Sequence, residues 1–134
     1  MRSGLWVALD IIGLCLATVW AERGAGQVIV HDMDIGRTVR IAVGGSLIVR
    51  LASNPSTGYQ WRDSGGRCLQ PVGRPQYEEP ATASLGASGI QVFRYKAIHA
   101  GTVQLRFRYV RPWEQRPVRS FAVTVHIVEP EGHR

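Results

Sequence analysis

The chain has 134 residues, of which 45% are hydrophobic, and this length and apolar content suit one packed domain and argue against a disordered chain. Its formal net charge is +6, with the basic residues scattered along the sequence, which favours weak attraction to acidic protein partners over a dedicated nucleic-acid site. The 15 glycines and 7 prolines, without a long amphipathic helical period, predict an all-β fold.

Residues 5–21 form a mostly apolar run that ends in the small residue Ala21. Such a run predicts a secretory signal peptide cleaved after Ala21, which leaves a secreted or periplasmic domain over residues 22–134. Asp10 lies inside the run and Arg2 is the only basic residue before it, so a retained single-span anchor is the alternative. The domain itself is not expected to bind a membrane.

Short runs in which apolar and polar residues alternate predict strands for most of the remaining chain. The expected strands cover residues 27–31, 39–43, 47–51, 59–62, 90–97, 103–109 and 121–127. The second and third runs are separated by Gly44 and Gly45, so they form either neighbouring strands or strands that are joined across two sheets.

The loop between the third and fourth runs consists of Asn54, Pro55, Ser56, Thr57, Gly58 and Tyr59. Pro55 fixes its own φ angle and restricts the residue before it, while Gly58 permits a backbone path that is closed to other residues. We therefore expect a stiff, exposed turn with the hydroxyls of Ser56 and Thr57 at its tip. A protruding loop of this kind suits insertion into the cleft of another molecule.

Cys68 is the only cysteine after the predicted cleavage site, so the domain cannot form an internal disulfide. A small buried side chain in a monomer is the expected role for it, and a disulfide-linked dimer is the alternative. No ligand pair with zinc-site spacing occurs, and we expect neither a metal nor a cofactor.

Three prolines lie between residues 69 and 80. Because proline has no backbone N–H to donate to a neighbouring strand, we expect at most edge strands there. Residues 81–89 are then mostly small, with Leu85 as the one bulky side chain. A plain connector is the default interpretation. The functional alternative is an exposed segment whose thin backbone lies against a partner.

Residues 111–117 interrupt the alternation between the last two expected strands, which predicts the tip of a hairpin. Trp113 lies at this tip, and the periodicity implies no core neighbour for it. The ring either folds back on its own scaffold or anchors a partner. Pro112 restricts the loop and lowers the ordering cost of binding.

Three loops in this order resemble those of the chagasin family of cysteine-peptidase inhibitors. The first loop, with Trp61 after it, resembles that family's Asn-Pro-Thr-Thr-Gly-aromatic loop, and Arg111, Pro112 and Trp113 resemble its Arg-Pro-Trp loop. The resemblance covers most of residues 39–128. It departs at Ser56, where the family commonly has threonine, and at Ser88, where the glycine-rich middle loop usually has a further glycine.

The resemblance implies an immunoglobulin-like antiparallel β-sandwich that carries all three loops at one end and reversibly blocks papain-like cysteine peptidases. The first loop would cover the catalytic cysteine and histidine of the peptidase, the middle loop would lie along the non-primed side, and Trp113 would pack on the primed side. The implied peptidase-binding residues are Asn54, Pro55, Ser56, Thr57, Gly58, Tyr59, Leu85, Gly86, Ala87, Ser88, Gly89, Arg111, Pro112 and Trp113.

Other functions compete with inhibition. A sandwich module could bind carbohydrate or another surface protein through the same loops, since one fold hosts many functions. An enzyme would need Cys68 to meet a histidine in space, but no nucleophile signature surrounds Cys68, so we expect no catalysis. The histidines available for such a pair are His31, His99, His126 and His133.

Overall fold

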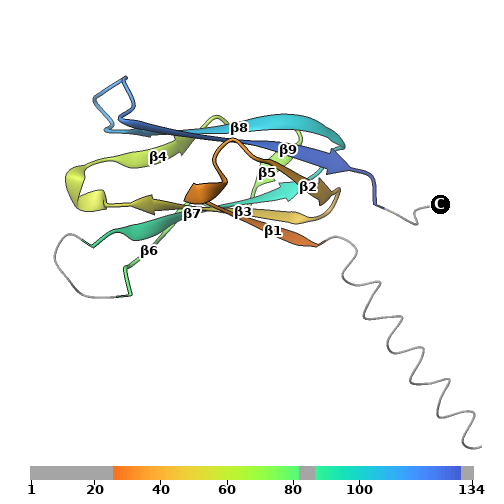
Figure 1. Ribbon diagram of the computed structural model, residues 1–134, viewed down its shortest axis with the longest axis horizontal. Coiled ribbons are helices and arrows are strands. Elements are labelled where there is room, and N and C mark those ends of the chain that lie inside the picture. The colour runs from red at the N-terminus through yellow and green to blue at the C-terminus, as the bar shows by residue number, and fades with distance from the viewer. Residues whose placement is uncertain (1–25, 82–86, 131–134) are drawn as a thin grey trace, which may run out of the picture.

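Residues 26–81 and 87–130 are described by the computed structural model, in which two β-sheets face each other (Figure 1). The first sheet has the order β1-β3-β7-β5, with β6 also paired to β7, and the second has the order β2-β9-β8-β4. The strands are β1 (Gln27–His31), β2 (Thr38–Ala42), β3 (Ser46–Ser53), β4 (Gln60–Asp63), β5 (Leu69–Pro71), β6 (Gln76–Glu78), β7 (Gly89–Ala97), β8 (Gly101–Val110) and β9 (Arg119–Val128). Residues 1–21, Leu85, Gly86 and His133 lie outside the described ranges.

The sandwich confirms the expected fold class, but its sheets are mixed and not purely antiparallel. Strand β1 runs parallel to β3, and β2 runs parallel to β9, whereas the pairs made by β7 and β8 are antiparallel. Both parallel strands lie at sheet edges. After β1 the chain passes to the other sheet through the short 3-10 helix η1 (Asp32–Asp34). Because β1 and β2 therefore lie in different sheets, they do not form an antiparallel hairpin, and each is free to pair in parallel with another strand.

The glycine pair Gly44-Gly45 also joins the two layers. Strand β2 lies in one sheet and β3 in the other, which decides between the two interpretations of this turn. Gly44 has a φ angle of +92°, a left-handed conformation that favours glycine. The turn is therefore a crossing between sheets and not a hairpin.

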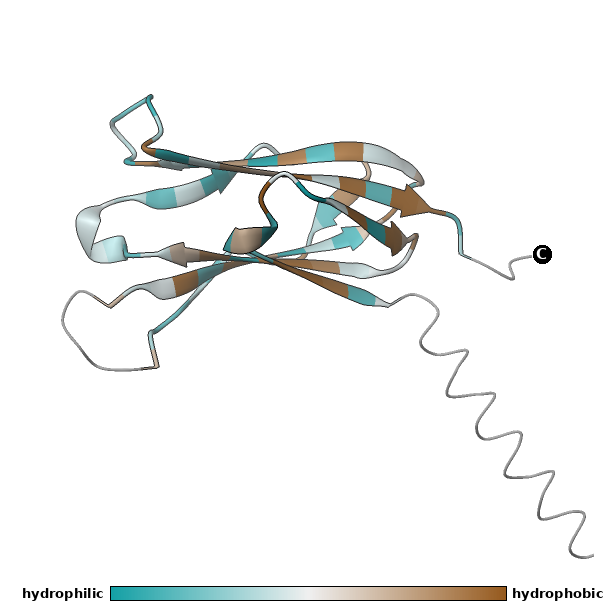
Figure 2. Cartoon of the chain, viewed as in Figure 1, coloured by the Kyte–Doolittle hydropathy of each residue, from teal (hydrophilic) through white to brown (hydrophobic). Residues whose placement is uncertain are grey.

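Apolar and polar residues alternate along β8 and β9, as Figure 2 shows. The apolar side chains of both strands point into the core between the sheets. Leu105 and Phe107 on β8 are fully buried, and so is Val125 on β9. The rings of Phe93 and Phe107 pack edge to face with their centroids 4.8 Å apart, an arrangement that aromatic pairs favour. Burial of these side chains is the main source of stability.

The proline-rich segment forms only short strands, as expected. Strands β5 and β6 both pair with β7. Pro71 ends β5 and Pro75 directly precedes β6, and at these positions the lack of a backbone N–H costs little. In the residues that the structure describes, no helix is long and apolar enough to cross a membrane.

The sheet register brings the predicted loops to one end of the sandwich. Ser53, at the end of β3, pairs with Gly89 at the start of β7, so the first loop begins beside the segment that leads into β7. Val110, at the end of β8, pairs with Gln60 at the start of β4. The β3–β4 and β8–β9 connections accordingly project at the same end, on the left in Figure 1.

Candidate functional site

The first loop is a single 3-10 turn, η2 (Pro55–Thr57), that is held together by its own side chains. Asn54 precedes the turn, and its side-chain Oδ1 accepts hydrogen bonds from the backbone N–H of Ser56 at 3.3 Å and from the Ser56 hydroxyl at 2.6 Å. An asparagine in this position satisfies donors that a turn otherwise leaves free. The asparagine of the motif therefore shapes the loop from within.

Thr57 and Gly58 complete the turn. The Thr57 hydroxyl donates to the backbone oxygen of Asn54 at 2.7 Å, and the Gly58 N–H donates to the Pro55 oxygen at 3.0 Å. Gly58 has a φ angle of +85°, which a side chain would strain. The expected exposed tip agrees with the geometry, since Ser56 and Thr57 are exposed.

The base of the loop is fixed by Tyr109 from β8. Its hydroxyl accepts a hydrogen bond from the Asn54 N–H at 2.9 Å. Its ring stacks on Tyr59 at a centroid distance of 5.3 Å and packs against Trp61 at 4.8 Å. Arg119 lies over the same group, with its guanidinium carbon 5.4 Å from the centroid of Trp61. These contacts connect the loop to the core at both of its ends.

Tyr109→Phe should lower the free energy of unfolding by about 1–2 kcal/mol, because the rings keep their packing while the half-buried Asn54 N–H loses its partner. Denaturant unfolding measures this loss. Inhibition should weaken as well, because the loop loses the bond at its base. An unchanged free energy of unfolding would mean that the hydroxyl does not hold the loop.

Further contacts hold the strands on either side of the loop. The Trp61 indole N–H donates to the Ala52 oxygen at 2.9 Å. The Ala52 N–H donates to the Asp32 carboxylate at 3.2 Å. Asp32 thus bonds β3 just past the last residue pair between β1 and β3. The side-chain amide of Gln91 bonds both the N–H and the C=O of Trp61. The backbone groups of Trp61 on the free edge of β4 are thus satisfied from inside the sandwich.

Arg111 joins the first loop to the third. Its Nε donates to the backbone oxygen of Thr57 at 3.2 Å, and its guanidinium carbon lies 4.4 Å from the centroid of Tyr59 and 5.9 Å from that of Trp113. A guanidinium over aromatic faces is a favourable contact. The resemblance implies a peptidase contact for Arg111, and in the free chain this residue links the two loops.

Trp113 is 72% exposed, so its ring does not fold back into the core. The nearest part of the ring lies beside Gly58, where a Cβ atom would be 3.5 Å from the Trp113 Cη2. The Glu114 N–H donates to the Arg111 oxygen at 3.0 Å, which closes a tight turn around Pro112. An exposed ring on a pre-ordered turn has the form of a partner anchor.

The middle segment is only partly described. Leu85 and Gly86 lie outside the described residues, Ala87 is half-buried, Ser88 is exposed and Gly89 is buried. A Cβ atom on Gly89 would come within 2.2 Å of the Glu78 backbone oxygen. Gly89 therefore permits close packing against β6, and Ser88 is the described residue of this segment that faces solvent.

The loop end, meaning the first and third loops with Ala87 and Ser88, offers shape and hydrogen-bonding groups. Cys68 is remote from it, since its Sγ lies 3.2 Å from the position of a Cβ on Gly101, at the start of β8, whereas the third loop follows the other end of that strand. Cys68 is half-buried and free. Among residues 26–81 and 87–130, no cluster of potential ligands could hold a metal ion.

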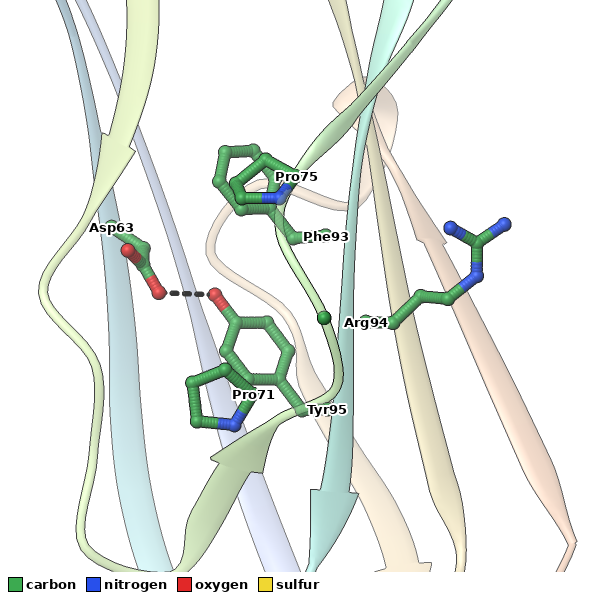
Figure 3. Close-up of a pocket in the computed structure, with 7 residues that line it drawn as sticks. Asp63, Pro71, Pro75, Phe93, Arg94 and Tyr95 are labelled. Atoms are coloured by element: carbon green, nitrogen blue, oxygen red, sulfur yellow. Dashed lines mark hydrogen bonds between the residues drawn. The ribbon is translucent and has the colours of Figure 1, made fainter.

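A separate cavity of about 230 Å³ lies at the open edge of the sandwich. Figure 3 shows Pro71, Pro75 and Phe93 around it, with the Tyr95 hydroxyl donating a hydrogen bond to Asp63 and with Arg94 pointing to the other side of β7. Burial, and then the bond to Asp63, raises the pKa of Tyr95, so the hydroxyl stays a donor. This pair joins the two layers, and no predicted site residue lines the cavity.

Comparison with known proteins gives consistent matches. Residues 40–125 match the family model described as Chagasin family peptidase inhibitor I42. Chagasin of Trypanosoma cruzi is 33% identical over 97 residues, which cover 69% of this chain and 88% of the relative. Amoebiasin-2 of Entamoeba histolytica is 28% identical over 134 residues, which cover 95% of this chain and 99% of the relative.

The fold is shared with solved structures. The crystal structure of a cysteine protease inhibitor from Entamoeba histolytica aligns with a TM-score of 0.66 at 24% identity, over 75% of this chain and 94% of that chain. This likeness shows the fold. The family is shown by the sequence matches and not by this structural likeness.

Proposed function

The chain belongs to the chagasin family of peptidase inhibitors, and from this premise we propose that its loop end blocks the active-site groove of a papain-like cysteine peptidase. The chain is an inhibitor of cysteine peptidases and not an enzyme. The observation that supports the proposed surface is the link made by Arg111, which bonds the tip of the first loop and contacts Trp113 of the third.

The first loop would enter the groove and cover the catalytic cysteine and histidine of the peptidase. Ser56 and Thr57 stand at its exposed tip, where they would meet these groups first. Trp113 would pack on one flank of the groove, and Ser88, with Leu85, Gly86 and Ala87, would lie along the other. Little conformational entropy is lost on docking, because Pro55, Gly58 and the Asn54 cap order the loop in advance.

The geometry also explains how the loop would resist cleavage. Pro55–Thr57 form a 3-10 turn, with bonds from the Thr57 N–H to the Asn54 oxygen and from the Gly58 N–H to the Pro55 oxygen. A peptidase that binds substrates in an extended conformation would find no peptide bond in register for attack. Tight and reversible blocking without chemistry follows from this arrangement.

Binding of carbohydrate by the same loops is less favoured. Stacking on sugars needs free aromatic faces, but the Tyr59 ring already contacts Tyr109 at 5.3 Å and Arg111 at 4.4 Å. Trp113 is the one ring of the described loop residues that stands largely in solvent. A single exposed ring between two joined loops is better suited to a protein groove.

Titration of the purified domain into papain tests the proposal. Hydrolysis of a peptide substrate should fall linearly with added domain and stop near one equivalent, because a preformed wedge loses little entropy on binding. A serine peptidase serves as the control and should keep its activity. Undiminished papain activity at a large excess of folded domain would contradict the proposal.

A further inference from the structure

Arginines gather on the outer face of the second sheet, beside the third loop. Arg62 on β4 pairs directly with Arg108 on β8, and Arg106 lies two residues before Arg108 on the same face. All three side chains are exposed. Like charges directly opposite one another destabilise a pair of strands, so this arrangement has a cost within the free chain.

The described residues offer these arginines no acidic partner. The salt bridges found in residues 26–81 and 87–130 use Arg37, Arg50 and Arg111. On the neighbouring strand β9, Arg108 faces Ser120 and Arg106 faces Ala122. The Arg106 guanidinium donates instead to the side-chain oxygen of Gln104 at 2.7 Å. The positive charge of this face is therefore not balanced by carboxylates of the described chain.

The charge continues from the loop end along the sandwich. Arg62 and Arg108 line a hollow together with Arg111 and Pro112 of the third loop, and they line a second hollow together with Arg74. The carboxylates at the two hollows are already engaged, since Glu114 lies 3.8 Å from Arg111 and Asp63 accepts the bond from Tyr95. We call Arg62, Arg74, Arg106 and Arg108 the arginine band.

We propose that the arginine band binds acidic side chains on the surface of the inhibited peptidase, beside its active-site groove. This inference depends on the proposed function. A protein that covers the third loop also comes to lie next to Arg62 and Arg108, because these share a hollow with Arg111. Carboxylates brought by that protein relieve the repulsion between the paired arginines, and guanidinium groups suit bidentate contact with carboxylates.

The test compares two double variants with the same change in net charge. Arg62→Glu/Arg108→Glu alters the band. Arg40→Glu/Arg67→Glu alters two exposed arginines far from the loops, since Arg40 pairs with His126 near the end of β9 and Arg67 precedes β5, which pairs with the end of β7. Association rates are measured by stopped-flow inhibition of a papain-like peptidase of net negative charge.

The band variant should associate at least about tenfold more slowly than the wild-type chain at low salt, because charges at the rim of an interface govern the rate of encounter. The control should lose no more than about twofold. Raising the ionic strength to about 1 M shortens the screening length to about 3 Å and should remove most of the difference. Arg62→Gln/Arg108→Gln, which removes these charges without reversing them, should show a smaller loss in the same direction, as expected for an effect of charge.

Four results would overturn the proposal. Equal slowing by the band variant and the control would reduce the effect to net charge. Unchanged association of the band variant with the peptidase, together with loss of its retention on a heparin column, would assign the band to the binding of a polyanion. Failure of the wild-type chain to inhibit would overturn the proposed function as well, whereas normal inhibition with equal rates for the two double variants would overturn the band alone.

Discussion

Trp113→Ala is expected to weaken inhibition of papain by about 2 kcal/mol or more, roughly thirtyfold, while the melting temperature stays nearly unchanged. The ring is 72% exposed in the free chain, so its removal opens no cavity in the core. Its burial would occur only in the complex, where a tryptophan commonly supplies a large share of the binding energy. Inhibition constants and thermal melting of the same preparations measure the two effects.

Val72→Ala is the matched control, since Val72 is 53% exposed and follows β5, with its N–H bonded to Arg94 in the middle of β7. It should leave inhibition intact. The opposite pattern for Trp113→Ala, a lower melting temperature with full inhibition, would mean that the ring stabilises the scaffold and does not anchor the partner.

Gly58→Val is expected to weaken inhibition by a similar amount, about 2 kcal/mol, through the shape of the loop. At a φ angle of +85°, a β-branched side chain strains the backbone by roughly 1–2 kcal/mol. Its methyl groups would also extend toward Trp113 and Arg111, since even a Cβ at this position lies 3.5 Å from the indole and 3.8 Å from the Arg111 Cγ. The two loops would then separate.

Gly73→Val is the control that separates the effect of backbone strain from the effect of the shape of the first loop. Gly73 has a φ angle of +72°, and nothing lies within 4 Å of the position of its Cβ. Both variants should therefore lose similar stability in denaturant unfolding, but only Gly58→Val should lose inhibition. Equal inhibition by the two variants would show that the conformation at Gly58 does not matter for binding.

Much of the scaffold could be predicted from the sequence because its signals are local. Strict alternation at Leu105, Phe107 and Tyr109 identified β8 and its buried face, and the prolines of residues 69–80 identified edge strands. The two parallel pairs could not be predicted, because the direction of β1 depends on where the chain goes after η1. Alternation defines the faces of a strand but not its neighbour.

The loops of the candidate site were located by their motifs, but the residues that hold them were not. The alternation along residues 103–109 predicts a buried Tyr109, yet nothing local indicates that its hydroxyl bonds Asn54. Arg119 follows the third loop without a motif of its own and lies over Trp61 in space. The Arg62 and Arg108 pair depends on the register of β4 against β8, which no single strand encodes.

A crystal structure of the domain bound to papain would show directly whether the loop end fills the active-site groove. We expect Thr57 to lie against the catalytic cysteine and histidine, Trp113 to be buried on a flank of the groove, and the turn at Pro55–Thr57 to keep its free conformation. A complex in which papain contacts the opposite end of the sandwich, with Trp113 still in solvent, would contradict it.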